Sequence, residues 1–184
     1  DISASKKKLN LPDKKIVGYV GRVSKEKNVK LLLEAFQRLE DQENLHLLIV
    51  GGGSQLERFK QQKNCTVTGF VDNVEDYLKA MDVFVMPSLT ETTSLATLEA
   101  MSSGLPVIVT KVGYMRKYVL KEHNGLFFPK NSPAVLALKI KKILDEPKLK
   151  EKLGSNARKT IAYSFSWERS INKIKRFLQK QYYS

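Results

Sequence analysis

Short apolar runs alternate with helical patterns along almost the whole chain, and this alternation is the feature that most limits its possible folds. The expected strands are residues 16–20, 45–50, 66–68, 83–86, 106–109 and 126–128. The expected helices are residues 28–39, 56–62, 74–81, 94–102, 134–144, 148–162 and 167–179. Strands that are separated by helices imply right-handed crossovers and a parallel sheet. We therefore predict an α/β fold, a Rossmann-like three-layer α/β/α sandwich with a parallel sheet of about six strands.

The composition is that of a globular domain in a reducing compartment. The chain has 184 residues, of which 42% are hydrophobic, and this is enough to bury a sizeable core. Its only cysteine is Cys65, so no disulfide framework is expected, and no apolar run approaches the length of a membrane span. We expect a cytoplasmic protein.

The net charge of +13 favours anionic partners such as nucleotides, nucleic acid or phospholipid surfaces. The basic residues are scattered, however, and ordinary solvated lysines explain the charge equally well. A nucleic-acid binder would need a clustered basic face with stacking aromatic residues, which the sequence does not show. We therefore expect no nucleic-acid partner, whereas the charge is compatible with contact at the inner face of an anionic membrane.

The two ends of the chain are expected to lie outside the core of the domain. We predict that residues 1–13 are the remnant of an interdomain linker and that residues 14–164 form the domain. Residues 165–184 are expected to form a C-terminal helix. One face of that helix is apolar, with Ile171, Ile174, Phe177 and Leu178 at helical spacing. That face must cover either this domain or a neighbouring one, and we interpret the sequence as a piece of a longer protein.

Glu91 and Glu99 occur where an open parallel sheet binds ligands. Glu91 lies in the loop after the expected strand 83–86, and Glu99 lies about one turn into the helix that follows. Carboxylates accept hydrogen bonds from vicinal hydroxyl groups, so the two acids indicate recognition of a hydroxyl-rich ligand. Taken alone, Glu91 is explained as well by a solvated loop acid and Glu99 by a helix-surface acid. Their shared placement at a strand end favours a ligand site.

A basic loop joins the first expected strand to the first helix. Gly21 allows a tight turn, and Arg22 and Lys27 flank a helix N-terminus. Guanidinium, ammonium and free N–H groups together suit a diphosphate. A basic turn with solvated ends is the alternative.

The turn Gly51-Gly52-Gly53-Ser54 has two interpretations. Its glycines permit close approach of the backbone to a ligand, and a sharp turn with an N-capping serine explains the same residues equally well.

Other chemistries find little support in the sequence. No Asp-x-Asp motif is present to hold Mg²⁺, because the acids of residues 72–76 have the wrong spacing. His46 and His123 are isolated, which argues against a zinc site. A Gly-x-Ser-x-Gly nucleophile elbow is absent as well. We expect no metal and no cofactor.

Several motifs follow one another in a specific order along the chain. They are Val20-Gly21-Arg22, Lys27-Asn28, Val50-Gly51-Gly52-Gly53, Gly69-Phe70-Val71, Met81-Asp82-Val83, Pro87-Ser88, the Glu-x7-Glu-Ala-Met run of residues 91–101, Gly104-Leu105-Pro106, Asn124-Gly125-Leu126 and Phe165-Ser166-Trp167-Glu168. In this order they resemble the C-terminal half of a family 4 (group 1) glycosyltransferase of the GT-B fold. The match covers roughly Lys14 to Tyr183.

The resemblance implies a binding site for a nucleotide-sugar donor, either UDP- or GDP-linked. It assigns catalytic contacts to three residues: Arg22 and Lys27 would bind the donor diphosphate, and Glu91 would contact the donor sugar. Glu99 would bind the ribose hydroxyls. The remaining donor-binding residues would be Gly21, Gly52, Gly69, Phe70, Val71, Thr92, Thr93, Ser94 and Leu95. Residues 69–71 would line the base, and the backbone of residues 93–95 would hold the diphosphate or the sugar.

The resemblance also implies an activity for a full-length enzyme. The family transfers a sugar with retention of configuration and without a bound metal. The acceptor would be a sugar, glycan or lipid, bound through an N-terminal domain that is absent here, as in polysaccharide or glycolipid biosynthesis. The isolated domain should be inactive, because catalysis in this fold takes place between the two halves. A nucleotide-sugar epimerase half and a non-catalytic nucleotide-sugar-binding module remain alternatives.

This chain departs from the family pattern at three places. Residues 91–94 read Glu-Thr-Thr-Ser in place of Glu-Gly-Phe-Gly, so the sugar subsite is expected to differ. Residues 113–117 read Gly-Tyr-Met-Arg-Lys in place of Gly-Gly-x-Pro-Glu, which affects the acceptor-side loop. Asn28 replaces the glycine after Lys27, and asparagine tolerates a positive φ better than most residues. The base, the sugar, the acceptor and the oligomeric state stay open.

Overall fold

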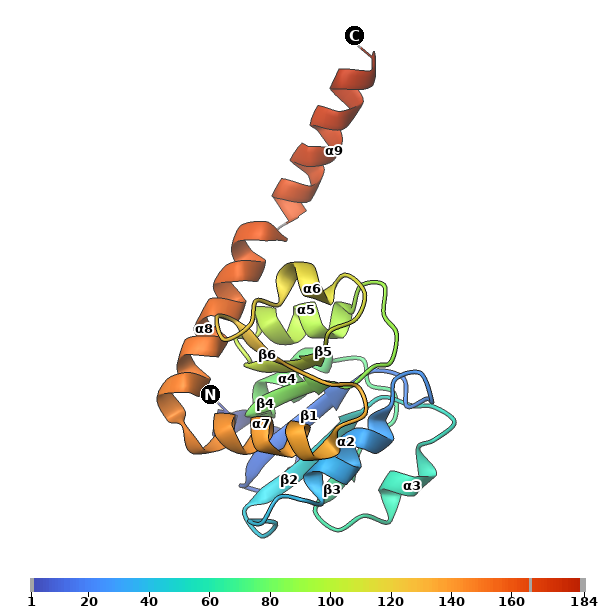
Figure 1. Ribbon diagram of the computed structural model, residues 1–184, viewed down its shortest axis with the longest axis vertical. Coiled ribbons are helices and arrows are strands. Elements are labelled where there is room, and N and C mark those ends of the chain that lie inside the picture. Colours follow the sequence, from blue (N-terminus) through green and yellow to red (C-terminus); the bar gives the residue numbers. More distant parts are fainter. Residues whose placement is uncertain (1, 166, 183–184) are drawn as a thin grey trace.

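The computed structural model describes residues 2–165 and 167–182, and in this part of the chain six parallel strands form one sheet (Figure 1). The strands are β1 (Lys15–Val20), β2 (Leu45–Val50), β3 (Cys65–Val67), β4 (Val83–Met86), β5 (Val107–Thr110) and β6 (Gly125–Phe128). Their order is β3-β2-β1-β4-β5-β6, and every neighbouring pair is parallel. This order defines a doubly wound sheet. The predicted α/β class, the parallel sheet and the number of strands are confirmed.

Helices cover both faces of the sheet (Figure 1). Helices α2 (Val29–Phe36) and α7 (Pro133–Asp145) pack against each other on one face, where α3 (Glu57–Lys60) follows β2. On the other face α4 (Val74–Ala80) contacts α1 (Ile2–Lys8), and α5 (Leu95–Ser102) contacts α8 (Pro147–Ser164). Short α6 (Met115–Tyr118) leads from β5 to β6. The result is the expected three-layer sandwich.

The strands are apolar because both of their faces are covered. All six residues of β2 and all four residues of β4 and β5 are buried. Continuous Val, Ile and Leu runs of this kind are typical of parallel sheets, in which alternation with polar residues is lost. Even His46 of β2 is buried, and its Nε2 lies 2.8 Å from Thr66 Oγ1.

A buried charge cluster fastens the N-terminal segment and α8 to the sheet. Asp82, 6% exposed, accepts a hydrogen bond of 2.8 Å from the backbone N–H of Ile16. The same carboxylate forms ion pairs with Lys150 of α8 and, at 3.5 Å, with Lys6 of α1. Lys6 also donates to the carbonyl of Lys14 at 2.6 Å. The segment that we expected to be a linker thus contains a helix docked on the domain, while its role between domains stays a prediction.

The C-terminal helix α9 (Trp167–Tyr182) continues from the end of α8 and projects away from the sheet (Figure 1). Its apolar side chains Ile171, Ile174, Phe177 and Leu178 are exposed. The prediction of an amphipathic helix is confirmed. The packing of this face on a neighbouring domain stays a prediction.

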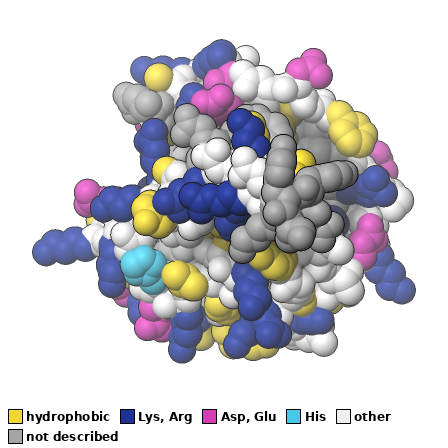
Figure 2. All heavy atoms as spheres, turned by 90° about the horizontal axis from the view of Figure 1, so that it is seen from above, with side chains coloured by type: hydrophobic (Ala, Val, Ile, Leu, Met, Phe, Trp, Pro, Cys, Tyr) yellow, Lys and Arg dark blue, Asp and Glu magenta, His cyan; other side chains and the backbone are white. Residues whose placement is uncertain are grey.

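Basic side chains are distributed over the surface that α9 projects from. Figure 2, seen from above, shows Lys and Arg side chains around much of this face, with fewer acidic ones among them. The scattered pattern agrees with the sequence, in which no dense tract occurs. Within the described residues no helix is both long and apolar enough to cross a membrane.

The Asp82 cluster gives a testable prediction about stability. Replacing Asp82 with Asn leaves the buried Lys6 ammonium without its counter-charge, and breaking a buried pair in this way costs about 3 kcal/mol of unfolding free energy. The measurement is urea denaturation of the purified chain. Asp145→Asn, which removes an exposed ion pair with Lys141, is the matched control and should change little. Equal losses in the two variants would contradict a structural role for Asp82.

Candidate functional site

The candidate site lies at the carboxyl ends of β1 and β4, which are adjacent in the centre of the sheet. From β1 the chain crosses toward β2, and from β4 it crosses toward β5, so the two connections leave in opposite directions. Open α/β sheets bind their ligands at such a switch point. The loops that begin here are residues 21–28 and 87–94, and they contain the predicted basic clamp and Glu91.

One cavity of about 520 Å³ brings these two loops together. Arg22, Glu26 and Lys27 line it from the first loop, and Thr90, Glu91 and Thr92 line it from the second. The three residues predicted to be catalytic therefore share one cavity, although they are distant in the sequence. Their chemical roles stay predictions.

Glu91 and Lys27 form an ion pair inside this cavity. Lys27 Nζ lies 2.5 Å from Glu91 Oε1, and the two side chains are 25% and 6% exposed. Ser88 Oγ donates a second hydrogen bond of 2.9 Å to the same Oε1. Thr110 Oγ1 in turn donates to the carbonyl oxygen of Ser88 at 2.6 Å. A buried chain of hydrogen bonds thus runs from β5 to the acid that the sequence placed beside the donor sugar.

Arg22 differs from Lys27 because its guanidinium is not tied into an ion pair within the described part of the chain. Its side chain is exposed, and within the described residues it makes no hydrogen bond or ion pair. Its carbonyl oxygen accepts a bond of 2.8 Å from the hydroxyl of Tyr19. Burial and the nearby charges of Glu91 and Glu26 raise the pKa of Tyr19, so its hydroxyl stays protonated. Tyr19 holds the turn in place and leaves the guanidinium of Arg22 free.

Asn28 adopts the left-handed conformation at the start of α2. Its φ is 52° and its ψ is 34°, which places it in the region that glycine occupies most readily. Its side chain donates to the carbonyl of Lys130 at 3.3 Å. Asparagine at this position therefore preserves the backbone turn that carries Lys27 into the cavity.

Backbone contacts fix the position of the Glu91 loop. The N–H of Leu89 donates to the carbonyl of Glu26 at 2.8 Å, and the N–H of Tyr114 donates to the carbonyl of Thr92 at 2.8 Å. Gly113, with φ 52°, lies so close that a Cβ built on it would be 1.8 Å from the carbonyl oxygen of Glu91. The 113–117 loop, which we linked to the acceptor side, thus supports the backbone of the Glu91 loop.

The N-terminus of α5 follows the same loop. Ser94 is buried, and its Oγ accepts a hydrogen bond of 3.2 Å from the N–H of Thr97. Its hydroxyl is therefore engaged as a helix cap. Thr92, Thr93 and Leu95 are exposed beside it and are available to a ligand.

The predicted base subsite lies on the β2 and β3 side of the switch point. A Cβ on Gly52 would lie 2.5 Å from the ring of Phe70, which is itself 86% exposed. Gly69 has a positive φ of 72° with no other atom close to its Cβ position. Neighbouring Gly51 and Gly53 approach the carbonyl oxygens of Gly21 and Val23. These two glycines serve packing between loops. The N-cap residue of α3 is Leu56, so the N-capping role that the sequence offered for Ser54 is wrong.

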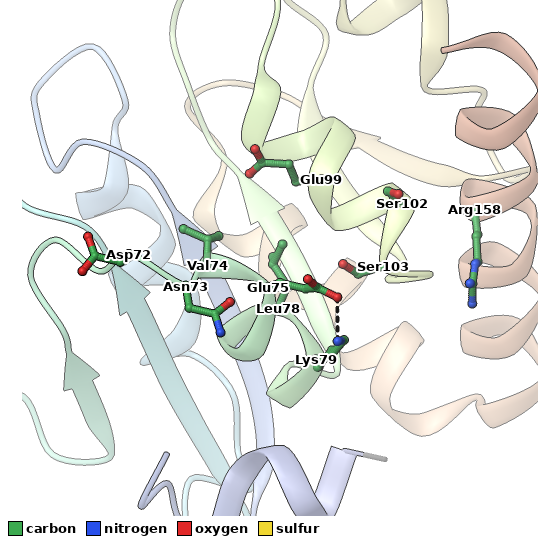
Figure 3. Close-up of a pocket in the computed structure, with 10 residues that line it drawn as sticks. All are labelled: Asp72, Asn73, Val74, Glu75, Leu78, Lys79, Glu99, Ser102, Ser103 and Arg158. Carbon is green, nitrogen blue, oxygen red and sulfur yellow. Dashed lines mark ion pairs between the residues drawn. The ribbon is translucent and has the colours of Figure 1, made fainter. Parts of the chain in front are cut away.

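Glu99 lines a different hollow from Glu91. This second cavity, of about 590 Å³, lies between α4, α5 and α8 (Figure 3). Asp72 and Asn73 line it on one side and Arg158 of α8 on the other, while Glu99 projects from α5. The side chain of Glu99 is exposed, and its carboxylate makes no hydrogen bond or ion pair with the described residues. The role of Glu99 as a ribose ligand stays a prediction.

Reasoning from sequence assigned no role to four residues that shape this site. They are Tyr19, Ser88, Gly113 and Tyr114. Ser88 follows Pro87 in a motif of the sequence, so its place next to the strand could be predicted from the sequence. Its hydrogen bond with Glu91 could not. Gly113 and Tyr114 appeared only as a departure from the family pattern.

The close approach of Gly113 to Glu91 gives a second prediction. Gly113→Ala adds a methyl group against the Glu91 carbonyl and strains a left-handed residue, which together cost at least about 3 kcal/mol of unfolding free energy. Gly104→Ala is the matched control, because Gly104 also has a positive φ but its nearest neighbour would lie at 3.9 Å. The control should lose about 1 kcal/mol, the backbone cost alone. Urea denaturation of both variants measures the difference. Equal losses of unfolding free energy would show that the Glu91 loop moves away from the added methyl group at no cost in stability.

Comparison with known proteins places the chain in a family. The model for glycosyl transferases group 1 matches residues 1–160. A capsular polysaccharide biosynthesis glycosyltransferase of Staphylococcus aureus is 28% identical over 183 residues, which are 92% of this chain and 48% of the relative. The chain spans less than half of the length of the first curated relatives that it matches.

Solved structures agree on the fold. A sucrose-phosphate synthase from Thermosynechococcus elongatus has a TM-score of 0.88 at 29% identity, covering 98% of this chain and 49% of that one. HepE of Anabaena in complex with UDP-glucose has a TM-score of 0.87 at 21% identity, covering 97% of this chain and 52% of that one, and this likeness shows the fold alone. The structure is one half of a GT-B fold, and the chain belongs to the group 1 glycosyltransferases.

Proposed function

We propose that this chain is the donor-binding domain of a retaining glycosyltransferase. In the full-length enzyme it would take a sugar from a nucleoside diphosphate and pass it to an acceptor with retention of configuration. The observation that supports this most is the cavity at the switch point, which joins Arg22 and Lys27 to Glu91. Two cations for a diphosphate and an acid for sugar hydroxyls are what such a donor requires.

The chemistry of the leaving group explains why the cations matter. When the bond to the sugar breaks, the departing diphosphate gains negative charge. The guanidinium of Arg22, the ammonium of Lys27 and the N–H groups at the start of α5 are the groups that would stabilise it. These residues would supply the positive charge without a metal ion or a further cofactor. Retention and independence from metal are part of the proposal.

The nucleoside would lie along the carboxyl ends of β2 and β3. The exposed ring of Phe70 beside Gly52 offers a flat apolar surface to a base, and backbone groups of residues 69–71 are within the same loop. Glu99 would accept hydrogen bonds from the ribose hydroxyls. UDP is the first nucleotide to test, since HepE was solved with UDP-glucose, and GDP is the second.

The acceptor would be bound by a second domain. GT-B enzymes work in the cleft between two halves, and this chain spans about half of the solved relatives. The exposed apolar side chains of α9 would then pack on that second domain. The acceptor would be a sugar, a glycan or a lipid, as in polysaccharide or glycolipid biosynthesis, and the net charge of +13 would assist contact with an anionic membrane. The isolated chain should bind the donor and turn over little.

Calorimetry of the chain with UDP, GDP and UDP-glucose tests the donor site. Arg22→Ala should weaken the binding of the preferred nucleotide roughly 10- to 100-fold, because a charge-assisted contact to the diphosphate is lost. Lys25→Ala removes the same charge from the same loop, but Lys25 is exposed and does not line the cavity. The control should therefore bind almost as tightly as the unchanged chain.

Two results would overturn this assignment. One is the absence of binding of UDP, GDP and UDP-glucose by the unchanged chain. The other is an equal effect of Arg22→Ala and Lys25→Ala, which would indicate attraction by the overall charge. Product analysis with the full-length enzyme separates transfer from epimerisation and from binding without turnover.

A further inference from the structure

Glu91 holds the ammonium that the donor diphosphate would need. Lys27 Nζ and Ser88 Oγ both contact Oε1 of Glu91, at 2.5 Å and 2.9 Å. Among the described residues Oε2 has no hydrogen-bond partner. The charge of Lys27 is thus engaged, and of the two described cations that line the cavity Arg22 is the one without an ion pair.

We infer that Glu91 competes with the donor diphosphate for Lys27 and that binding of the donor sugar relieves this competition. The ion pair thereby shifts the preference of the site toward the nucleotide that carries a sugar. This inference rests on the proposed function. It assigns Glu91 a part in discrimination between donor and product, in addition to its expected contact with the sugar.

Of the two partners, Lys27 is the one able to move. The carboxylate of Glu91 is 6% exposed and is held from behind by Ser88, which Thr110 fixes in turn. Its backbone is supported by the close approach of Gly113. Lys27 has a long unbranched side chain that is 25% exposed. When phosphate oxygens draw the ammonium away, Glu91 therefore stays where it is.

The two nucleotides then leave Glu91 in different surroundings. A largely buried carboxylate that loses its counter-charge is costly unless new donors replace the ammonium. Sugar hydroxyls supply such donors to Oε2 and Oε1. A bare nucleoside diphosphate supplies none and brings a terminal phosphate whose negative charge repels the acid. Binding of the diphosphate alone is thus opposed by the ion pair, whereas the sugar-linked form is opposed less.

Isothermal calorimetry of the 184-residue chain with UDP and UDP-glucose tests the competition directly. Glu91→Gln keeps the size of the side chain and releases Lys27, so the affinity for UDP should rise roughly 3- to 30-fold. The affinity for UDP-glucose should rise less or fall, and the ratio of the two affinities should shift toward UDP. Glu91→Ala also releases Lys27 and should give the same gain for UDP, which keeps the test open if the glutamine variant loses its fold.

Two controls separate the release of Lys27 from the mere loss of a negative charge. Glu26→Gln removes an acid that lines the same cavity but forms no ion pair with Lys27, and it should produce a small gain that is equal for both nucleotides. In a Lys27→Ala background, the gain from Glu91→Gln should largely disappear, because no ammonium is left to release.

The possible failures are distinguishable. Suppose that the unchanged chain binds UDP or GDP. If Glu91→Gln then leaves the affinity for UDP unchanged, or raises it equally in the Lys27→Ala background, the competition between Glu91 and the diphosphate is refuted. The proposed donor site is retained in that case. GDP and its sugar-linked form replace the uridine pair if only GDP binds. If the unchanged chain binds neither nucleotide, the proposed function is overturned and the inference with it.

Discussion

The parallel pairing of β1 with β4 is the constraint on which the site depends. Val17 lies opposite Val83 and Gly18 opposite Phe84 in this ladder. Gly18 also leaves room for the side chain of Met81, because a Cβ on Gly18 would lie 2.0 Å from the Met81 sulfur. Since both strands end at the same edge and their connections diverge, the two following loops open beside each other. The cavity between them is a consequence of strand order.

The loops keep their shape through backbone contacts and a few glycines. One hydrogen bond joins Leu89 of one loop to Glu26 of the other, and another joins Tyr114 to Thr92. Gly113 permits the second contact because a side chain would overlap the Glu91 carbonyl. The chemical groups of the site, such as the exposed guanidinium of Arg22, project from these loops. A loop backbone held in this way can stay in place when a ligand arrives, although Lys27 has to leave Glu91 before its charge can serve another partner.

Family membership and the geometry of the site explain different properties of the chain. The family model and the structural relatives establish the group and the fold. They do not explain why Lys27 is paired in this chain or why Asn28 and Thr92 replace glycines. The structure accounts for Asn28 through its left-handed backbone. Thr92 lines the cavity and Thr93 is exposed next to it, so the substitutions of the usual glycine and phenylalanine alter the surface that a donor sugar would meet.

The sequence by itself determined the fold class, the strand positions and the family. β2 and β4 begin and end at the residues expected from their apolar runs, because buried parallel strands need continuous apolar sequence. Helix boundaries were less accurate, and α1 and α6 were not foreseen, because short helices are stabilised more by packing than by their own residues.

Only the tertiary structure decided which functional groups meet. The Lys27–Glu91 pair joins residues 64 apart in the sequence, and no local pattern of either loop encodes it. In the same way, Glu91 and Glu99 belong to one short motif yet line different cavities. The reason is that helix direction and loop support, set by packing across the whole domain, orient each side chain. The spacing of the two acids indicated the region of the ligand site, and the fold determined what each of them contacts.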